Sequence, residues 1–94
     1  MLRKGNLFYD WYGKCIDVVF EYEEFYDDEV HVFGGLRRGQ PLELLTDEGW
    51  KPTRIEYDPR YDDLSQDYYG DGGWYLVGFE EFRELAGLYV RIEA

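Results

Sequence analysis

The sequence has few of the residues from which catalytic and metal centres are usually built. Its 94 residues include one cysteine, Cys15, and one histidine, His31. A lone cysteine cannot form a disulfide within the chain and argues against a cysteine-based metal site. Cys15 and His31 could be imagined as a nucleophile and its base. More commonly, however, such a cysteine is a small strand residue and such a histidine is a surface or edge residue. We therefore expect no enzyme and no cofactor.

Long hydrophobic runs and clusters of basic residues are also absent. No stretch approaches the roughly eighteen apolar residues of a membrane helix or contains a signal-peptide core, which predicts a soluble, cytoplasmic protein. Twenty-one acidic residues against ten basic ones give a net charge of −11, spread over both halves of the sequence. This charge repels nucleic-acid phosphates and anionic membranes, so we expect neither as a direct partner. It would instead steer the protein toward a basic protein surface.

Aromatic residues are abundant, and the apolar residues mostly recur every second position. The 20 % aromatic content provides enough apolar area to argue against disorder. Alternation is typical of half-buried strands. It predicts two strands joined around residues 12–14, two more joined around residues 47–49, and further strands in WYLVGF and LYVRIEA. Pro52 suggests that its strand lies at an edge or is bulged there.

One segment has helical character. In FEEFRELAG, residues 79–87, Phe79, Phe82 and Leu85 could share one side, and Gly87 supplies a stop. We expect a short helical segment near residues 79–86. No repeat or second domain is evident, so residues 1–94 form a single domain.

Three motifs resemble those of SH3 domains: LFYDWY, RRGQPLELLTDEGW and ELAGLYVRI. The resemblance implies an all-β fold, a small SH3-like barrel of five to six antiparallel strands. Two departures are a longer connection between Asp10 and Gly39 and the lack of a proline before the final tyrosine. A fold analogy does not transfer a function.

The motifs WKPTRIEYD, WYLVG and GLYVRI resemble the core of a small bacterial domain family of unknown function, DUF5348. They occur in the same order over residues 39–92. This family is often met in genomes rich in mobile elements, so the resemblance implies a bacterial or phage-like origin. It transfers no catalytic residue.

Two sets of residues are candidates for binding a partner. The aromatic set would lie near the peptide-binding surface if the SH3-like alignment holds, although single rings are more often core residues. The acidic set could mimic nucleic acid if its two segments were brought together, but solvated, solubilising faces are the commoner role of such runs. The acidic candidates are Glu21, Glu23, Glu24, Asp27, Asp28, Glu29, Asp58, Asp62, Asp63, Asp67 and Asp71, and the aromatic candidates are Tyr9, Tyr12, Tyr26, Trp50 and Tyr89.

The hypothesis that follows is a non-enzymatic acidic binding protein that docks on a basic protein surface. Its most concrete form is a mobile-element or phage inhibitor that mimics nucleic acid at a host nuclease, of the anti-CRISPR or anti-restriction type. The alternative is an SH3-like adaptor that binds a linear peptide in an aromatic groove. A weaker alternative is a Ca²⁺ site formed by the aspartates of the loop at residues 58–73, although their spacing does not match an EF-hand.

Overall fold

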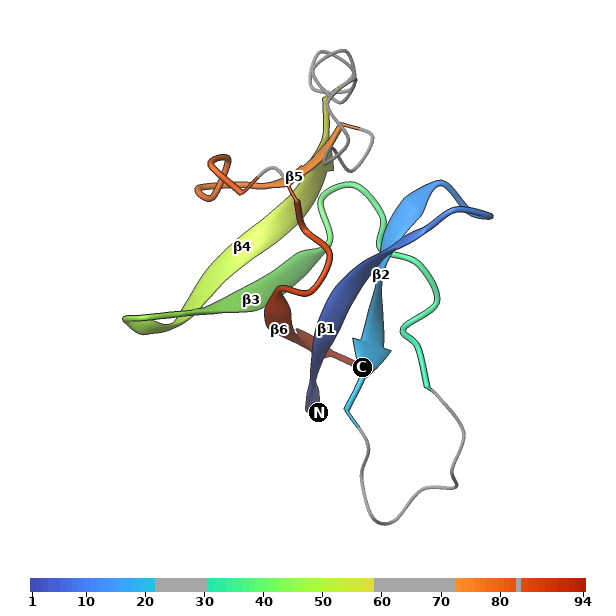
Figure 1. Ribbon diagram of the computed structural model, residues 1–94. Helices are drawn as coiled ribbons and strands as arrows, with labels where there is room; N and C mark the ends of the chain where they lie inside the picture. The colour runs from blue at the N-terminus through green and yellow to red at the C-terminus, as the bar shows by residue number, and fades with distance from the viewer. Residues whose placement is uncertain (22–30, 59–72, 83) are drawn as a thin grey trace.

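Six antiparallel β-strands form one sheet in the computed structural model, which describes residues 1–21, 31–58, 73–82 and 84–94 (Figure 1). The strands are β1 (Leu2–Asp10), β2 (Cys15–Phe20), β3 (Pro41–Thr46), β4 (Gly49–Tyr57), β5 (Trp74–Leu76) and β6 (Tyr89–Glu93). Their order across the sheet is β2-β1-β6-β3-β4-β5. The predicted all-β class, the six strands and both predicted hairpins are confirmed.

Strand β6 joins the two hairpins into one sheet. It pairs with β1 from Leu2↔Glu93 to Asn6↔Tyr89, but with β3 only at Glu43↔Arg91 and Leu44↔Val90. The strands β2, β1 and β6 therefore meet β3, β4 and β5 along a short ladder (Figure 1). No strand pairing joins β2 to β5 in the described part of the chain, so the sheet is not a closed barrel.

The core lies on the face of the sheet that the apolar alternation predicts. In LYVRIEA the alternation places Leu88, Val90 and Ile92 on one face of the strand, and Val90 and Ile92 are fully buried while Leu88 packs against the core. Burying a side chain of this size contributes about 1.5–3 kcal/mol. Leu36 and Leu85 extend the core from the segments that connect the strands. The buried apolar residues are Leu7, Ile16, Val18, Phe20, Leu36, Leu42, Leu44, Ile55, Leu76, Leu85, Val90 and Ile92.

Asp17 is buried, although alternation places it on the face of β2 opposite the core. The segment of residues 31–36 runs along β2, where Phe33 N–H donates to Val18 O at 2.9 Å and Leu36 N–H to Ile16 O at 2.8 Å. Only 4 % of Asp17 remains exposed. Its Oδ1 accepts hydrogen bonds from the backbone N–H groups of Val18 at 2.7 Å and Gly34 at 3.0 Å. A buried carboxylate thus fastens the covering segment to β2.

The prediction of a helical segment near residues 79–86 is wrong. The described residues of this range form turns and no helix. Phe82 N–H donates to Phe79 O at 3.0 Å, and Leu88 N–H donates to Leu85 O at 3.1 Å; both bonds close single turns. Gly78 and Gly87 have positive φ angles of 86° and 91°, and the few residues between them are too short a run for cooperative helix formation. Among the described residues, no helix has the length and apolar character needed to span a membrane.

Pro52 lies on a part of β4 that, among the described residues, is paired with a strand on one side only. Ile55 N–H donates to Gln40 O on the β3 side, while Arg54 O accepts from Val77 on the β5 side. Backbone groups alternate in direction along a strand, so the nitrogen of Pro52 faces the β5 side. Strand β4 lies between β3 and β5 and is therefore not an edge strand, but β5 pairs with it only at residues 55–57, so in the described part of the chain no strand pairs with the β5 side of Pro52.

Candidate functional site

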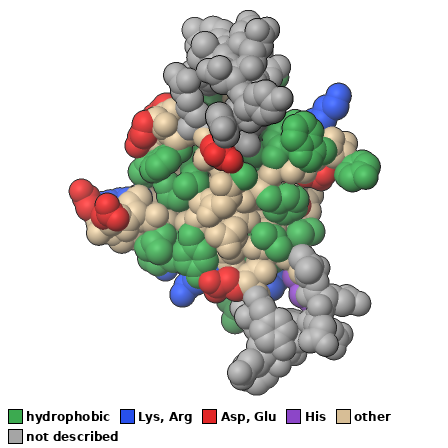
Figure 2. Space-filling model, in the orientation of Figure 1, with side chains coloured by type: hydrophobic (Ala, Val, Ile, Leu, Met, Phe, Trp, Pro, Cys, Tyr) green, Lys and Arg blue, Asp and Glu red, His purple; other side chains and the backbone are tan. Residues whose placement is uncertain are grey.

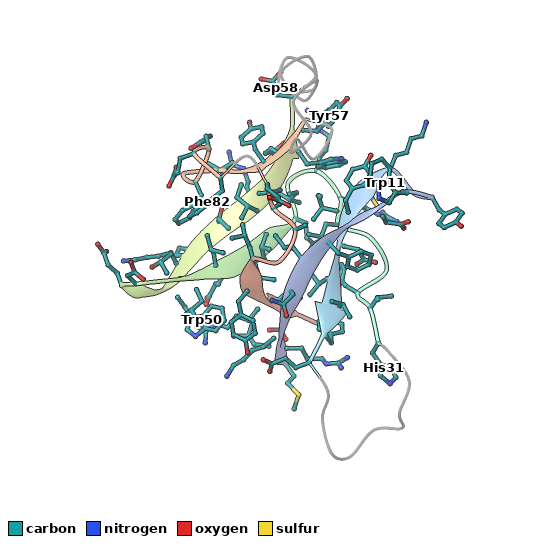
Figure 3. All side chains as sticks on the ribbon, viewed as in Figure 1. Trp11, His31, Trp50, Tyr57, Asp58 and Phe82 are labelled. Carbon is teal, nitrogen blue, oxygen red and sulfur yellow. The ribbon has the colours of Figure 1, made fainter. Side chains whose placement is uncertain are left out.

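The two most exposed aromatic side chains in the described part of the chain lie at the tip of the β1–β2 hairpin. Trp11 is 80 % exposed and Tyr12 is fully exposed, and Figure 3 shows Trp11 at the outer end of this hairpin. Tyr12 is among the residues predicted from the sequence to bind a partner, whereas Trp11 is not. The available signal was the WY pair beside Gly13, because two large residues at the centre of a tight turn cannot both reach the core.

Three contacts hold this tip, two to its backbone and one between side chains. Asp10 Oδ1 accepts a hydrogen bond from Tyr12 N–H at 3.0 Å. The indole N–H of Trp74, from β5, donates to Lys14 O at 3.3 Å. Tyr9 packs partly into the core and contacts Trp11 edge-on, with ring centroids 4.8 Å apart. The tip is therefore tied both to its own strand and to the opposite end of the sheet.

A second aromatic cluster joins β4 and β6 across the strand between them, β3. The rings of Trp50 and Tyr89 are 5.7 Å apart, and the guanidinium of Arg91 lies 4.6 Å from the Trp50 ring centroid. Glu43 holds Arg91 in an ion pair. Because the Arg91 guanidinium already covers one face of the Trp50 ring, the cation–π contact of this cluster is made within the chain.

The predicted aromatic residues do not form one surface. Tyr9 and Tyr12 belong to the hairpin tip, whereas Trp50 and Tyr89 belong to the second cluster, and Figure 3 shows Trp11 and Trp50 on opposite sides of the molecule. Tyr26 lies outside the described residues.

The Tyr89 hydroxyl donates a hydrogen bond to Glu21, which raises the pKa of Tyr89 to about 12, with smaller contributions from burial and the negative charge of Glu21. The folded state favours the neutral phenol, so its stabilisation is complete below pH 10 and is lost as pH rises toward 12. We predict that Tyr89 ionises above the ordinary tyrosine pKa of about 10 in an NMR titration of ¹³Cζ-labelled tyrosine. Glu21→Gln should move the Tyr89 midpoint to lower pH; an unchanged Tyr89 midpoint would contradict the assigned cause.

Of the predicted acidic residues, Glu21 and Asp58 fall in the described part of the chain. Asp58 N–H donates to Gly73 O at 2.9 Å and so fixes the two ends of the segment at residues 59–72. Figure 3 shows His31, beside the other acidic segment, at the opposite end of the molecule from Asp58. The remaining candidates lie outside the described residues: Glu23, Glu24, Asp27, Asp28, Glu29, Asp62, Asp63, Asp67 and Asp71.

Charge is unevenly divided between the sheet and these two segments. Residues 22–30 and 59–72 contain nine acidic residues and one basic residue, a net charge of −8 out of −11. Charged residues of the sheet instead form ion pairs, namely Lys51–Glu48, Arg91–Glu43 and the contacts of Arg38 and Arg54 with Glu56. Figure 2 shows acidic and basic side chains interspersed with apolar ones on the described surface.

The structure does not bring together Cys15 and His31, the two residues considered as a nucleophile and its base. Cys15 begins β2, whereas His31 O accepts from Phe20 N–H at the other end of the strand, so about 16 Å of extended chain separates the two positions. Burial, followed by the charges of Asp10 and Asp17, raises the pKa of the Cys15 thiol, which lowers its reactivity. Within the described ranges, no three His, Cys, Asp or Glu residues form a metal-binding group. The aspartates considered for Ca²⁺ lie outside them.

Comparison with known proteins gives one family and one solved structure. A crystal structure of a protein from Ruminococcus gnavus, a structural genomics target, has 31 % sequence identity and a TM-score of 0.62, covering 96 % of this chain and all of that one. Curated proteins give no significant match. Residues 5–92 match the family described as a domain of unknown function, DUF5348, which also takes in the first hairpin. The chain therefore belongs to the DUF5348 family.

Proposed function

We propose that the protein is a non-enzymatic binding protein that docks on a basic protein surface. The observation that carries the proposal is the division of charge: the sheet pairs many of its charges internally, whereas residues 22–30 and 59–72 hold a net charge of −8. A localised excess of one sign attracts an oppositely charged partner and accelerates encounter.

A more specific form of the proposal is an inhibitor of a host nuclease, of the anti-CRISPR or anti-restriction type, that occupies the nucleic-acid site. The high negative charge, the small size and the mobile-element association implied by the family resemblance favour it.

Charge neutralisation in one acidic segment tests this function. We predict that Asp27→Asn, Asp28→Asn and Glu29→Gln together reduce the affinity for a purified host nuclease, such as a CRISPR effector, by about tenfold or more at low salt. The difference from the unmodified protein should shrink as salt screens the charges. Isothermal titration calorimetry at several salt concentrations measures both effects.

The matched control neutralises three exposed acidic residues of the sheet and its turns, Asp47, Glu81 and Glu84. These changes remove the same charge but should reduce affinity much less. An affinity that does not change between low and physiological salt would refute docking by charge. Equal losses in the two triple variants would show that only the total charge matters.

The second candidate function is an SH3-like adaptor that binds a linear peptide. It is favoured by the Trp74 indole bond to Lys14 O, which links the start of β5 to the residue before β2 and supports an SH3-like, barrel-type arrangement. In this case Trp50→Ala should abolish peptide binding, whereas neutralising the acidic residues at 58–71 should have little effect. The reverse pattern favours docking by charge.

A further inference from the structure

We propose that the hairpin tip formed by Trp11 and Tyr12 is the apolar anchor of the docking surface, and that it inserts into an apolar pocket bordered by basic residues on the partner protein. The inference rests on the proposed function and adds to it the residues that enter the partner. It concerns a site different from the acidic segments and from the Trp50 cluster.

The exposure of the tip distinguishes it from the other aromatic residues on the described surface. Trp11 is 80 % and Tyr12 102 % exposed, whereas the ring of Phe82 is 38 % exposed; Met1, at the end of the chain, is the one apolar side chain in the described residues with a comparable exposure, 82 %. Burying a side chain of this size would stabilise the fold by about 1.5–3 kcal/mol, and each of the two exposed rings gives up that contribution. Tryptophan and tyrosine are also the residues most enriched among those that dominate binding energy at protein interfaces.

The tip is also built to hold its shape before it binds. Lys14 has a positive φ of 51°, a conformation that is uncommon for a residue with a side chain and costs about 1 kcal/mol or more. The Trp74 indole bond to Lys14 O and the Asp10 bond to Tyr12 N–H hold this backbone in place. A tip that is already ordered loses less conformational entropy on binding.

The charges around the tip identify the kind of partner. Asp10 lies at its base and accepts the Tyr12 N–H bond, and the chain that carries the tip has a net charge of −11. This negative charge would repel phosphate, which disfavours nucleic acid and anionic lipid. A second copy of a chain with a charge of −11 is disfavoured by the same repulsion. A protein pocket with lysine or arginine at its border matches both the rings and the acids.

Synthetic peptides of defined composition separate the apolar contribution from the charged one. We expect the protein to bind a peptide of alternating lysine and leucine about tenfold or more tighter than one of alternating lysine and serine, as measured by calorimetry. The double variant Trp11→Ala and Tyr12→Ala should lose this preference while still binding the lysine–serine peptide. Tyr12→Ser alone, at a fully exposed position that cannot disturb packing, should lose part of it.

Phe82→Ala, at an exposed ring on another part of the molecule (Figure 3), is the control and should retain the preference. Retention of the preference in the double variant, or equal affinity of the unmodified protein for both basic peptides, would overturn the inference and leave docking by charge intact. Failure of the unmodified protein to bind either basic peptide would instead refute the proposed function, and the inference with it.

Discussion

Gly5→Ala is expected to destabilise the fold by about 3 kcal/mol or more, a large part of the roughly 5–14 kcal/mol expected for a domain of this length. A methyl group at this position would lie 2.2 Å from Val19 O and 2.9 Å from Val18 Cγ1. Both atoms belong to β2, which is paired with β1 and covered on its other side by residues 31–36. The backbone cannot move aside, so the cost should reach the upper end of that for overpacked cores. Urea denaturation followed by circular dichroism measures it.

Gly49→Ala separates steric overlap from the general cost of removing a glycine. Gly49 has a positive φ of 99°, but no atom lies within 4 Å of the position that its methyl group would occupy. We expect a loss of about 1 kcal/mol from backbone strain alone. If Gly5→Ala cost no more than Gly49→Ala, the close approach of β1 to β2 would not be the reason that glycine is required at position 5.

Asp17→Ala is expected to destabilise the protein by about 3 kcal/mol. The substitution removes the acceptor of the Val18 and Gly34 N–H groups, and buried donors left without an acceptor cost about 1–3 kcal/mol each. Asp17→Asn keeps a side-chain oxygen and should lose about half as much. Chemical denaturation gives these differences, and hydrogen exchange at Gly34 should accelerate in the alanine variant because the covering segment is released.

The exposed residue Asp47 provides the comparison for Asp17. Asp47→Ala changes the net charge by the same amount but should alter stability by less than about 0.5 kcal/mol. A loss at Asp17 as small as that at Asp47 would mean that the buried carboxylate does not fasten the segment of residues 31–36.

The strands could be predicted because their signals are local. Alternation predicted the strands, and residues 12–14 and 47–49 predicted the turns of both hairpins. Burial of Asp17 could not be predicted, because it depends on a segment about seventeen residues further along that bends at Gly34. The helical pattern of residues 79–86 also misled, since this segment must turn between β5 and β6 and has too few residues to pay for a helix.

The candidate site was predicted only in part, for a similar reason. The sequence does not show which of its aromatic rings enter the core. The contact of Trp50 with Arg91 also depends on the Glu43↔Arg91 register between β3 and β6. Tyr12 was identified by analogy, whereas its neighbour Trp11 was not. The position of Trp11 in a tight turn was the local signal that could have found it.

Pro52 has a consequence for how copies of this protein behave when they are crowded. Among the described residues, no strand pairs with the β5 side of residues 49–52 of β4, where a strand of another molecule could add and start a growing ribbon. An incoming strand would meet a ring instead of a hydrogen-bond donor at position 52, and the ladder would be interrupted there. One proline thus protects the open side of the sheet from lateral aggregation.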